Sequence, residues 1–230
     1  MAVVAKHPWY LQDATDYFNG TPHIISTFGS FPELQESINT TESKFNYIFF
    51  PHVSTIIPSE IYKNFRCIGF HTGDLPKDRG GSPIQNKILR KEFLTSVSAF
   101  QIGEEIDGGA IYTQRQIDLS FGDVEDILKR VSSLCAQMMV EIVNNEALPK
   151  VQLGTPSSFK RLSPQDSMLP DSLTSLNEVY DRIRMVDGLD YPKAHIFVGN
   201  LRIAFENAKL EGEILTSTCS FTLEDAKDAK

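Results

Sequence analysis

The residues best suited to chemistry lie between positions 70 and 83, where a histidine follows a short apolar run. Residues 67–70 are apolar and predict a buried strand, so His71 would lie at the carboxyl end of that strand. Ligands of α/β sheets bind at this edge, and an imidazole, which titrates at about pH 6.5, can exchange a proton there. The following loop is rich in glycine and proline, which allow the main chain to approach a ligand closely. We therefore consider His71 a candidate catalytic residue, with a hydrogen-bonded structural histidine in a rigid loop as the alternative.

A second candidate is Asp107, which precedes two glycines between two extended segments. A tight turn at this point would aim the carboxylate at a cleft, although a plain β-turn is the alternative. The spacing alone does not bring His71 and Asp107 together. The chain has no phosphate-binding glycine fingerprint, and its three cysteines and its histidines show no metal-ligand spacing, so we expect no metal site.

Short apolar runs alternate with helix-like segments through the first part of the chain. This alternation predicts an α/β fold with a Rossmann-like, mostly parallel sheet flanked by helices. Pro51 is expected to end the third strand. The predicted strands cover residues 3–5, 23–25, 46–50, 67–70 and 96–102, and the predicted helices cover residues 10–18, 84–93 and 121–143.

The texture changes after residue 150, where a polar segment with three prolines extends to about residue 172. A helix over residues 172–185 and two short strands around Gly199 and Asn200 predict a small helix-plus-hairpin subdomain. We therefore expect three parts of the chain. These are a catalytic domain over residues 1–150, a small C-terminal subdomain over residues 151–221 and a disordered tail over residues 222–230.

The composition is that of a globular protein without a signal peptide or a membrane span, which predicts a cytoplasmic location. The 230 residues include 22 basic and 30 acidic side chains, for a net charge of −8. This balance argues against a nucleic-acid backbone as the main partner. It leaves room for a local basic patch that binds a small phosphorylated molecule.

Several of these segments resemble, in order and spacing, the formyltransferase family that uses N10-formyltetrahydrofolate. The family has a strand that ends in Asn-x-His, then Leu-Pro, Arg-Gly, a small residue before Pro, and a later Asp-x-Gly-x-Ile turn. With further similarity in the segments 160–167 and 183–194, the resemblance covers about residues 46–210. The matching residues are His71, Leu75, Pro76, Arg79, Gly80, Ser82, Pro83, Asp107, Gly109 and Ile111.

The resemblance implies transfer of a formyl group from N10-formyltetrahydrofolate to a primary amine. His71 would be the base or would polarise the formyl oxygen, and Asp107 would orient His71 or assist the proton transfer. Arg79 would bind a substrate phosphate or, alternatively, hold the loop in place. The expected cofactor-binding residues are Pro76, Gly80, Ile106 and Asp107, and the expected substrate-binding residues are Lys77, Arg79, Gly81, Ser82, Gln85 and Asn86.

Within the family, the Phe-His-x-x-Asp-Leu-Pro and Arg-Gly-Gly-Ser-Pro-x-Gln-Asn forms look most like the sugar-nucleotide N-formyltransferases of bacterial pseudaminic-acid-type pathways. This implies a UDP- or dTDP-linked 4-amino-4,6-dideoxy sugar as substrate in surface-glycan biosynthesis, a homodimer, and neither nucleic acid nor membrane as partner. A methionyl-tRNA formyltransferase is the alternative, disfavoured by the acidic balance and by the short C-terminal part.

One departure from the family motivates a third interpretation, a catalytically silent binding homologue. The family's catalytic Asn falls on Gly69, which has no side chain. Asn86, Gln85 or His52 could supply the missing donor, and so could the main-chain N–H groups of Thr72 and Gly73.

Overall fold

The computed structural model describes residues 1–40, 45–52 and 55–224. The chain divides into two compact units, each of which draws on several segments of the sequence. The first unit comprises Met1–Pro83, Leu94–Ile117 and Leu128–Phe159, and the second comprises Ile84–Phe93, Asp118–Ile127 and the chain from Lys160. This division does not coincide with the predicted boundary at residue 150, because each unit contains residues from both sides of it.

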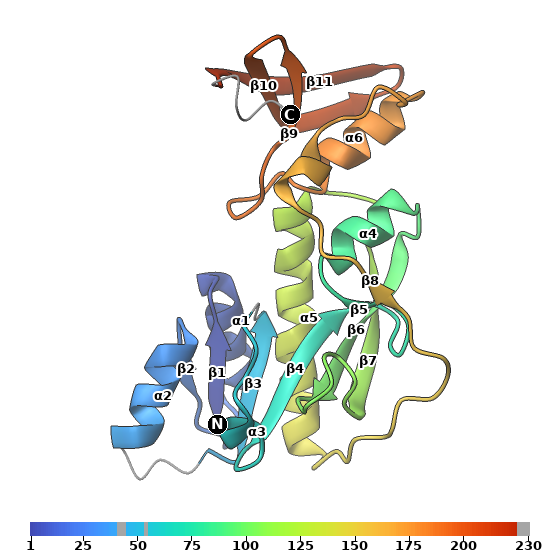
Figure 1. The fold of residues 1–230 in the computed structure, drawn as a ribbon. Helices are drawn as coiled ribbons and strands as arrows, with labels where there is room; N and C mark the ends of the chain where they lie inside the picture. Colours follow the sequence, from blue (N-terminus) through green and yellow to red (C-terminus); the bar gives the residue numbers. More distant parts are fainter. Residues whose placement is uncertain (41–44, 53–54, 225–230) are drawn as a thin grey trace. The chain divides into compact units, whose positions relative to one another are not determined.

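The first unit is built on a six-stranded sheet in the order β2-β1-β3-β4-β6-β7 (Figure 1). The first four strands along the chain pair in parallel, and β6 pairs antiparallel with β4. The predicted mostly parallel sheet is therefore confirmed. The strands are β1 (Ala2–Ala5), β2 (Ser26–Phe28), β3 (Tyr47–His52), β4 (Arg66–Thr72), β6 (Leu94–Gln101) and β7 (Ile111–Asp118).

Helices cover both faces of this sheet. Because β2 and β3 lie on opposite sides of β1, right-handed crossovers place α1 (Pro8–Phe18) and α2 (Phe31–Thr40) on opposite faces. On one face, Leu34 of α2 packs against a buried cluster that includes Ile48, Phe50 and Cys67. Burial raises the pKa of the Cys67 thiol to about 12, so this cysteine serves as packing. The sheet order reverses between β1 and β3, which makes the carboxyl edge of these strands the expected ligand edge.

Two further helices belong wholly or largely to the first unit. The short α3 (Ser59–Tyr62) precedes β4, and the long α5 (Val124–Asn144) lies beside α1, to which it is joined by a hydrogen bond between Tyr17 and Ser133. The sequence predicted α5 to within three residues but did not predict α2. A two-stranded parallel ladder pairs β5 (Arg79–Gly80) with β8 (Ser158–Phe159).

The predicted end of the third strand at Pro51 is wrong. Strand β3 continues through Pro51 to His52, and its register against β1 shifts between Val3 and Ala5. Proline cannot donate to the ladder and is accommodated in strands at such irregularities. The second strand lies three residues later than predicted. The prediction treated the apolar residue Ile24 as part of a buried strand, but Ile24 is 84% exposed and precedes the strand.

The second unit contains the C-terminal antiparallel sheet, in the order β11-β10-β9. The hairpin predicted around Gly199 and Asn200 is present, with Gly199 at a φ of 63°. It belongs to a three-stranded sheet, however, whose strand β11 was not predicted; the side chains of β11 are half-buried or exposed, so no buried face marks this strand. The elements are α4 (Pro83–Leu89, whose first residue belongs to the first unit), a 3-10 turn (Pro164–Ser167), α6 (Leu176–Arg184), β9 (Ala194–Val198), β10 (Leu201–Glu211) and β11 (Ile214–Leu223).

The last strand also bears on the predicted tail. Thr222 and Leu223 pair with Arg202 and Leu201 of β10, so these two residues belong to a strand. Residues 225–230 of the predicted tail lie outside the described residues.

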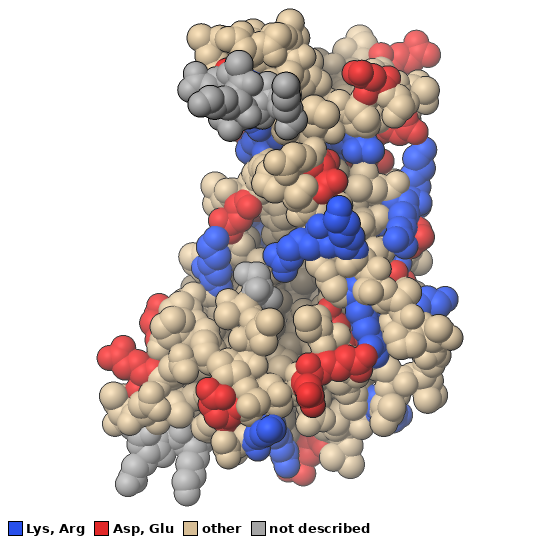
Figure 2. Space-filling model, viewed as in Figure 1, with Lys and Arg blue, Asp and Glu red and all other residues tan. Residues whose placement is uncertain are grey.

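The charged side chains are unevenly distributed on the surface. Figure 2 shows Lys and Arg side chains in separate groups between groups of Asp and Glu side chains. None of the helices in the described residues is both long enough and apolar enough to cross a membrane.

Candidate active site

The predicted histidine lies where the sequence placed it, at the carboxyl end of a parallel strand. His71 is the penultimate residue of β4, its Cα pairs with that of Ser98 on β6, and it is only 7% exposed. Strands β3 and β6 flank β4 on either side, so the main chain of His71 is fixed at the ligand edge of the sheet.

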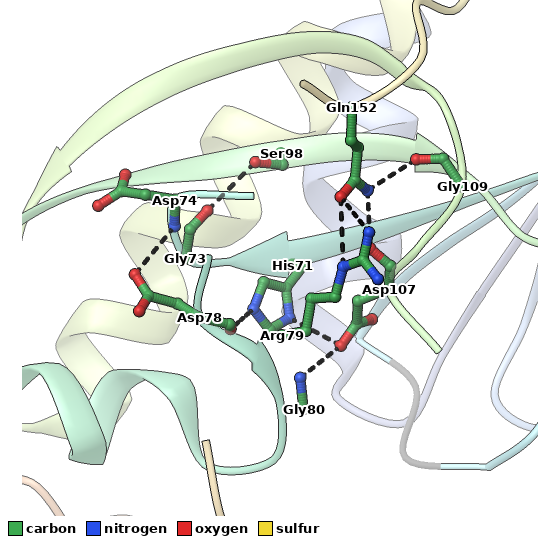
Figure 3. A network of polar contacts seen from close by, with 10 residues as sticks. All are labelled: His71, Gly73, Asp74, Asp78, Arg79, Gly80, Ser98, Asp107, Gly109 and Gln152. Atoms are coloured by element: carbon green, nitrogen blue, oxygen red, sulfur yellow. Dashed lines mark hydrogen bonds and ion pairs between the residues drawn. The ribbon is translucent and has the colours of Figure 1, made fainter. Parts of the chain in front are cut away.

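The loop after β4 folds back over the imidazole. The main-chain oxygen of Asp78 lies 2.6 Å from His71 Nε2, and Asp78 adopts a left-handed φ of 60° (Figure 3). The N–H of Gly73 donates to the carbonyl oxygen of Ser96 at 2.7 Å. Within this loop the Leu75–Pro76 peptide bond is cis. The loop therefore presents main-chain atoms, rather than side chains, to one edge of the histidine ring.

The predicted aspartate meets the histidine from the turn between β6 and β7. Asp107 Oδ2 lies 3.5 Å from His71 Nδ1 and accepts a hydrogen bond from the Gly80 N–H at 2.9 Å. The Asp107 side chain is 17% exposed, against 7% for His71, so the carboxylate is the more accessible of the two. A carboxylate at this distance stabilises an imidazole that has taken up a proton.

A glycine makes this turn possible. A Cβ atom on Gly109 would lie 1.7 Å from the main-chain oxygen of Gln101, which is closer than any two such atoms can approach. The Gln101 N–H donates to the Ala110 oxygen at 2.8 Å, so the two strands are already in contact here. The second glycine of the Asp-Gly-Gly sequence thus brings Asp107 to its position.

Two side chains from distant segments hold the turn and the loop together. Arg79 pairs with Glu105 and donates to Gln152 Oε1 at 2.8 Å, while Gln152 Nε2 donates to the oxygens of Asp107 and Gly109 at 2.7 and 2.8 Å (Figure 3). These contacts support the alternative in which Arg79 holds the loop. Neither Gln152 nor Asp78 was singled out in the sequence, because Gln152 is an isolated polar residue outside any motif and Asp78 contacts His71 through its main-chain oxygen.

Gln152→Glu is expected to lower the free energy of unfolding by about 1–3 kcal/mol. A carboxylate can still accept from Arg79, but it cannot donate to the two carbonyl oxygens that Gln152 Nε2 contacts. Urea-induced unfolding measures the change. Gln137→Glu is the matched control, since Gln137 donates to the Tyr17 hydroxyl in an exposed position. Equal effects of the two substitutions would contradict the assigned role of Gln152.

The other residues predicted from the sequence differ in their exposure and in the unit to which they belong. Lys77 is exposed, and Ile106 beside Asp107 is 65% exposed, so both could reach a ligand. Gln85 and Asn86 belong to the second unit, where Gln85 donates to the Met185 oxygen at 3.1 Å and Asn86 donates to the Lys160 oxygen at 3.1 Å. The remaining predicted residues lie in the first unit and are half-buried; they are Pro76, Gly80, Gly81 and Ser82.

At the position of the family's catalytic asparagine, a side chain would require the neighbouring side chains to shift. A Cβ atom on Gly69 would lie 2.8 Å from Phe100 Cζ and 3.2 Å from Ile102 Cγ1. Among the donors considered for the missing group, the Gly73 N–H is used by Ser96. The side chains of Gln85 and Asn86 donate to main-chain oxygens of the second unit. His52 and the Thr72 N–H remain predictions.

The fold and the site define an α/β protein that holds a histidine and a carboxylate, His71 and Asp107, 3.5 Å apart at the carboxyl edge of a mostly parallel sheet. A chain titled methionyl-tRNA formyltransferase from Clostridium thermocellum is 33% identical, with a TM-score of 0.89, and the match covers 97% of this chain and 98% of that one. The chain accordingly belongs to the formyltransferase family, whose formyl donor is N10-formyltetrahydrofolate.

Three further comparisons refine the relationship. Residues 164–222 match a family model described as the methionyl-tRNA formyltransferase C-terminal domain. The methionyl-tRNA formyltransferase of Sulfurimonas denitrificans is 28% identical over 168 residues, which are 68% of this chain and 56% of that protein. The chain thus spans little more than half the length of this curated relative. A 4-N formyltransferase from Francisella tularensis is 18% identical with a TM-score of 0.64 over 97% of both chains, a likeness that shows the fold alone.

These comparisons overturn the expectation of a sugar-nucleotide substrate and of a protein without a nucleic-acid partner. The more similar relatives carry the name methionyl-tRNA formyltransferase, and one of them is matched over almost its whole length. A short C-terminal part is therefore no argument against that name. Net charge misled because it sums over the whole chain, whereas binding of a polyanion depends on local groups of cations.

Proposed function

We propose that this protein transfers the formyl group of N10-formyltetrahydrofolate to the amine of the methionyl group on methionyl-tRNA. The observation that carries the proposal is the His71–Asp107 pair, 3.5 Å apart, in a chain that is 33% identical to the Clostridium protein over 97% of its length. The cytoplasmic location expected from the sequence is part of the same proposal.

The residues at the site suit a folate donor. Ile106 is 65% exposed beside Asp107 and offers apolar surface for a planar ring next to the proton-transfer pair. The donor supplies an electrophilic formyl carbon: the amine nitrogen bonds to this carbon, the bond from the carbon to N10 breaks, the leaving N10 takes up a proton, and the amine loses a proton. His71 accepts that proton, and the Asp107 carboxylate stabilises the resulting imidazolium.

The test is an acceptor assay with the full chain. Purified protein is mixed with N10-formyltetrahydrofolate and methionyl-tRNA, and formyl-methionine released from the tRNA is measured by mass spectrometry. Uncharged tRNA and free methionine serve as control acceptors, and we expect product only with methionyl-tRNA. A folded protein that gives no product would overturn the proposal in favour of a silent homologue, with Gly69 as the reason.

A further inference from the structure

The two ring nitrogens of His71 have different surroundings. Nε2 lies 2.6 Å from the main-chain oxygen of Asp78. Gly73 closes the same edge of the ring, since a Cβ atom on it would lie 2.7 Å from His71 Nε2 and 3.0 Å from Cδ2. Nδ1 faces Asp107 Oδ2 at 3.5 Å instead. Main-chain atoms therefore enclose Nε2, whereas Nδ1 faces the more accessible carboxylate.

This asymmetry determines where the ring carries its proton. A carbonyl oxygen can only accept a hydrogen bond, so the short contact with Asp78 requires the proton on Nε2. A neutral imidazole has one N–H group, which leaves a lone pair on Nδ1. When Nδ1 takes up a proton, both nitrogens of the imidazolium face acceptors, the Asp78 oxygen and the Asp107 carboxylate.

We infer that Asp78 is a positioning residue whose main-chain oxygen fixes the Nε2–H tautomer of His71, so that Nδ1 is the nitrogen that accepts the substrate proton. This inference rests on the proposed function. It places Asp107 on the reacting side of the ring. In a Ser-His-Asp triad, by contrast, the carboxylate lies behind the histidine and orients it. Here a peptide carbonyl does that work, and the carboxylate is left to face the substrate.

The local structure explains how the Asp78 oxygen is held in place. Asp78 has a φ of 60°, a conformation that aspartate tolerates better than most residues. Its side chain is buried, and its Oδ2 accepts from the Asp74 N–H at 3.4 Å. Its own N–H donates to Ser157 Oγ at 3.3 Å, and the N–H of Arg79 donates to the Ser157 oxygen at 3.0 Å. The turn is therefore closed both by its own carboxylate and by the strand segment that runs beside it.

The direct test is nitrogen-15 NMR of the full chain labelled at its histidines. A ring nitrogen that bears a proton differs widely in chemical shift from one with a lone pair, so the tautomer is read directly. Among the signals of the five histidines, those of His71 are identified by their loss in His71→Asn. At alkaline pH, where an imidazole is neutral, we expect His71 in the Nε2–H form. An Nδ1–H form in the wild type would overturn the inference, whatever the activity.

Variants then link the tautomer to catalysis. Gly73→Ala places a methyl group against Nε2 and should lower kcat by up to about 100-fold with a shift in the His71 signals, because small displacements at a reacting group have effects of this size. Asp78→Ala should act in the same direction, and Asp78→Asn, which keeps the left-handed preference, should restore both readouts. Gly103→Ala is the control, since nothing lies within 4 Å of the added Cβ.

The outcomes separate this inference from the proposed function. A wild type with the Nε2–H tautomer but no formyl transfer would overturn the proposed function and leave the position of the proton established. Unchanged kcat and tautomer in both Gly73→Ala and Asp78→Ala would overturn the inference while formyl transfer stands. If Gly73→Ala does not fold, the wild-type tautomer and the comparison of Asp78→Ala with Asp78→Asn still decide the matter.

Discussion

His71→Ala is expected to lower kcat/KM for formyl transfer to methionyl-tRNA by about 10²–10⁴-fold, the usual contribution of a positioned general base. The variant removes the imidazole that accepts the amine proton. The Asp107 carboxylate then keeps the hydrogen bond from the Gly80 N–H. Initial rates at several concentrations of methionyl-tRNA measure the effect. The loss should fall on kcat more than on KM, because the ring acts in the transition state.

His23→Ala is the matched control for this experiment. His23 lies in the same unit and contacts Asn144 Oδ1 at 2.9 Å, away from the loop after β4. We expect its kcat/KM to remain at the wild-type level. A loss of similar size in both variants would contradict a chemical role for His71. So would a loss of activity in His71→Ala that is fully explained by the fraction of unfolded protein at the assay temperature.

The second large effect is expected at the turn that carries Asp107. Gly109→Ala would force a methyl group to within 1.7 Å of the Gln101 oxygen, so the turn has to move. We expect the free energy of unfolding to fall by about 3 kcal/mol, the upper end of the usual cost of overpacking. In a protein of this size that corresponds to a fall in Tm of roughly 6–12 °C. Because Gln152 binds the Gly109 oxygen, the displacement should also carry Asp107 away from His71.

Differential scanning calorimetry and the acceptor assay check this prediction together. Gly103→Ala, at the other end of the same connection, should change Tm by less than about 2 °C, since surface substitutions cost little. A Gly109→Ala protein that melts and reacts like the wild type would show that the turn can relax without disturbing the site.

The sequence predicted features that depend on a local pattern of residues. His71 follows a run of buried residues and precedes a glycine- and proline-rich loop, so its place at the end of a strand could be predicted. The meeting of His71 with Asp107 could not, because it depends on β4 pairing with β6, a long-range choice of neighbour that no local pattern encodes. Asp78 escaped notice because its main-chain oxygen makes the key contact, and that atom is the same in every residue.

Other predictions remain open or were wrong for physical reasons. Gln85 and Asn86 were placed at the site through the family resemblance and stay a prediction, although their side chains donate to main-chain oxygens of the second unit. The partner was predicted from a net charge of −8, a sum that carries no information about where the cations lie. Strand β11 was missed because none of its side chains is buried, so its apolar residues were not assigned to a core-facing strand.

The network around Arg79 has a consequence for the order in which this protein becomes active during synthesis. The donors and acceptors that hold the loop after β4 come from Gln152 and Ser157, which follow Arg79 and Asp78 in the chain by more than 70 residues. Closing so long a loop is slow and depends on nearly all of the first unit being present. A nascent chain that has exposed β4 and even Asp107 to solvent therefore holds both reactive side chains without their final alignment. The emergence of the segment up to Phe159 supplies the last donors and acceptors of this network.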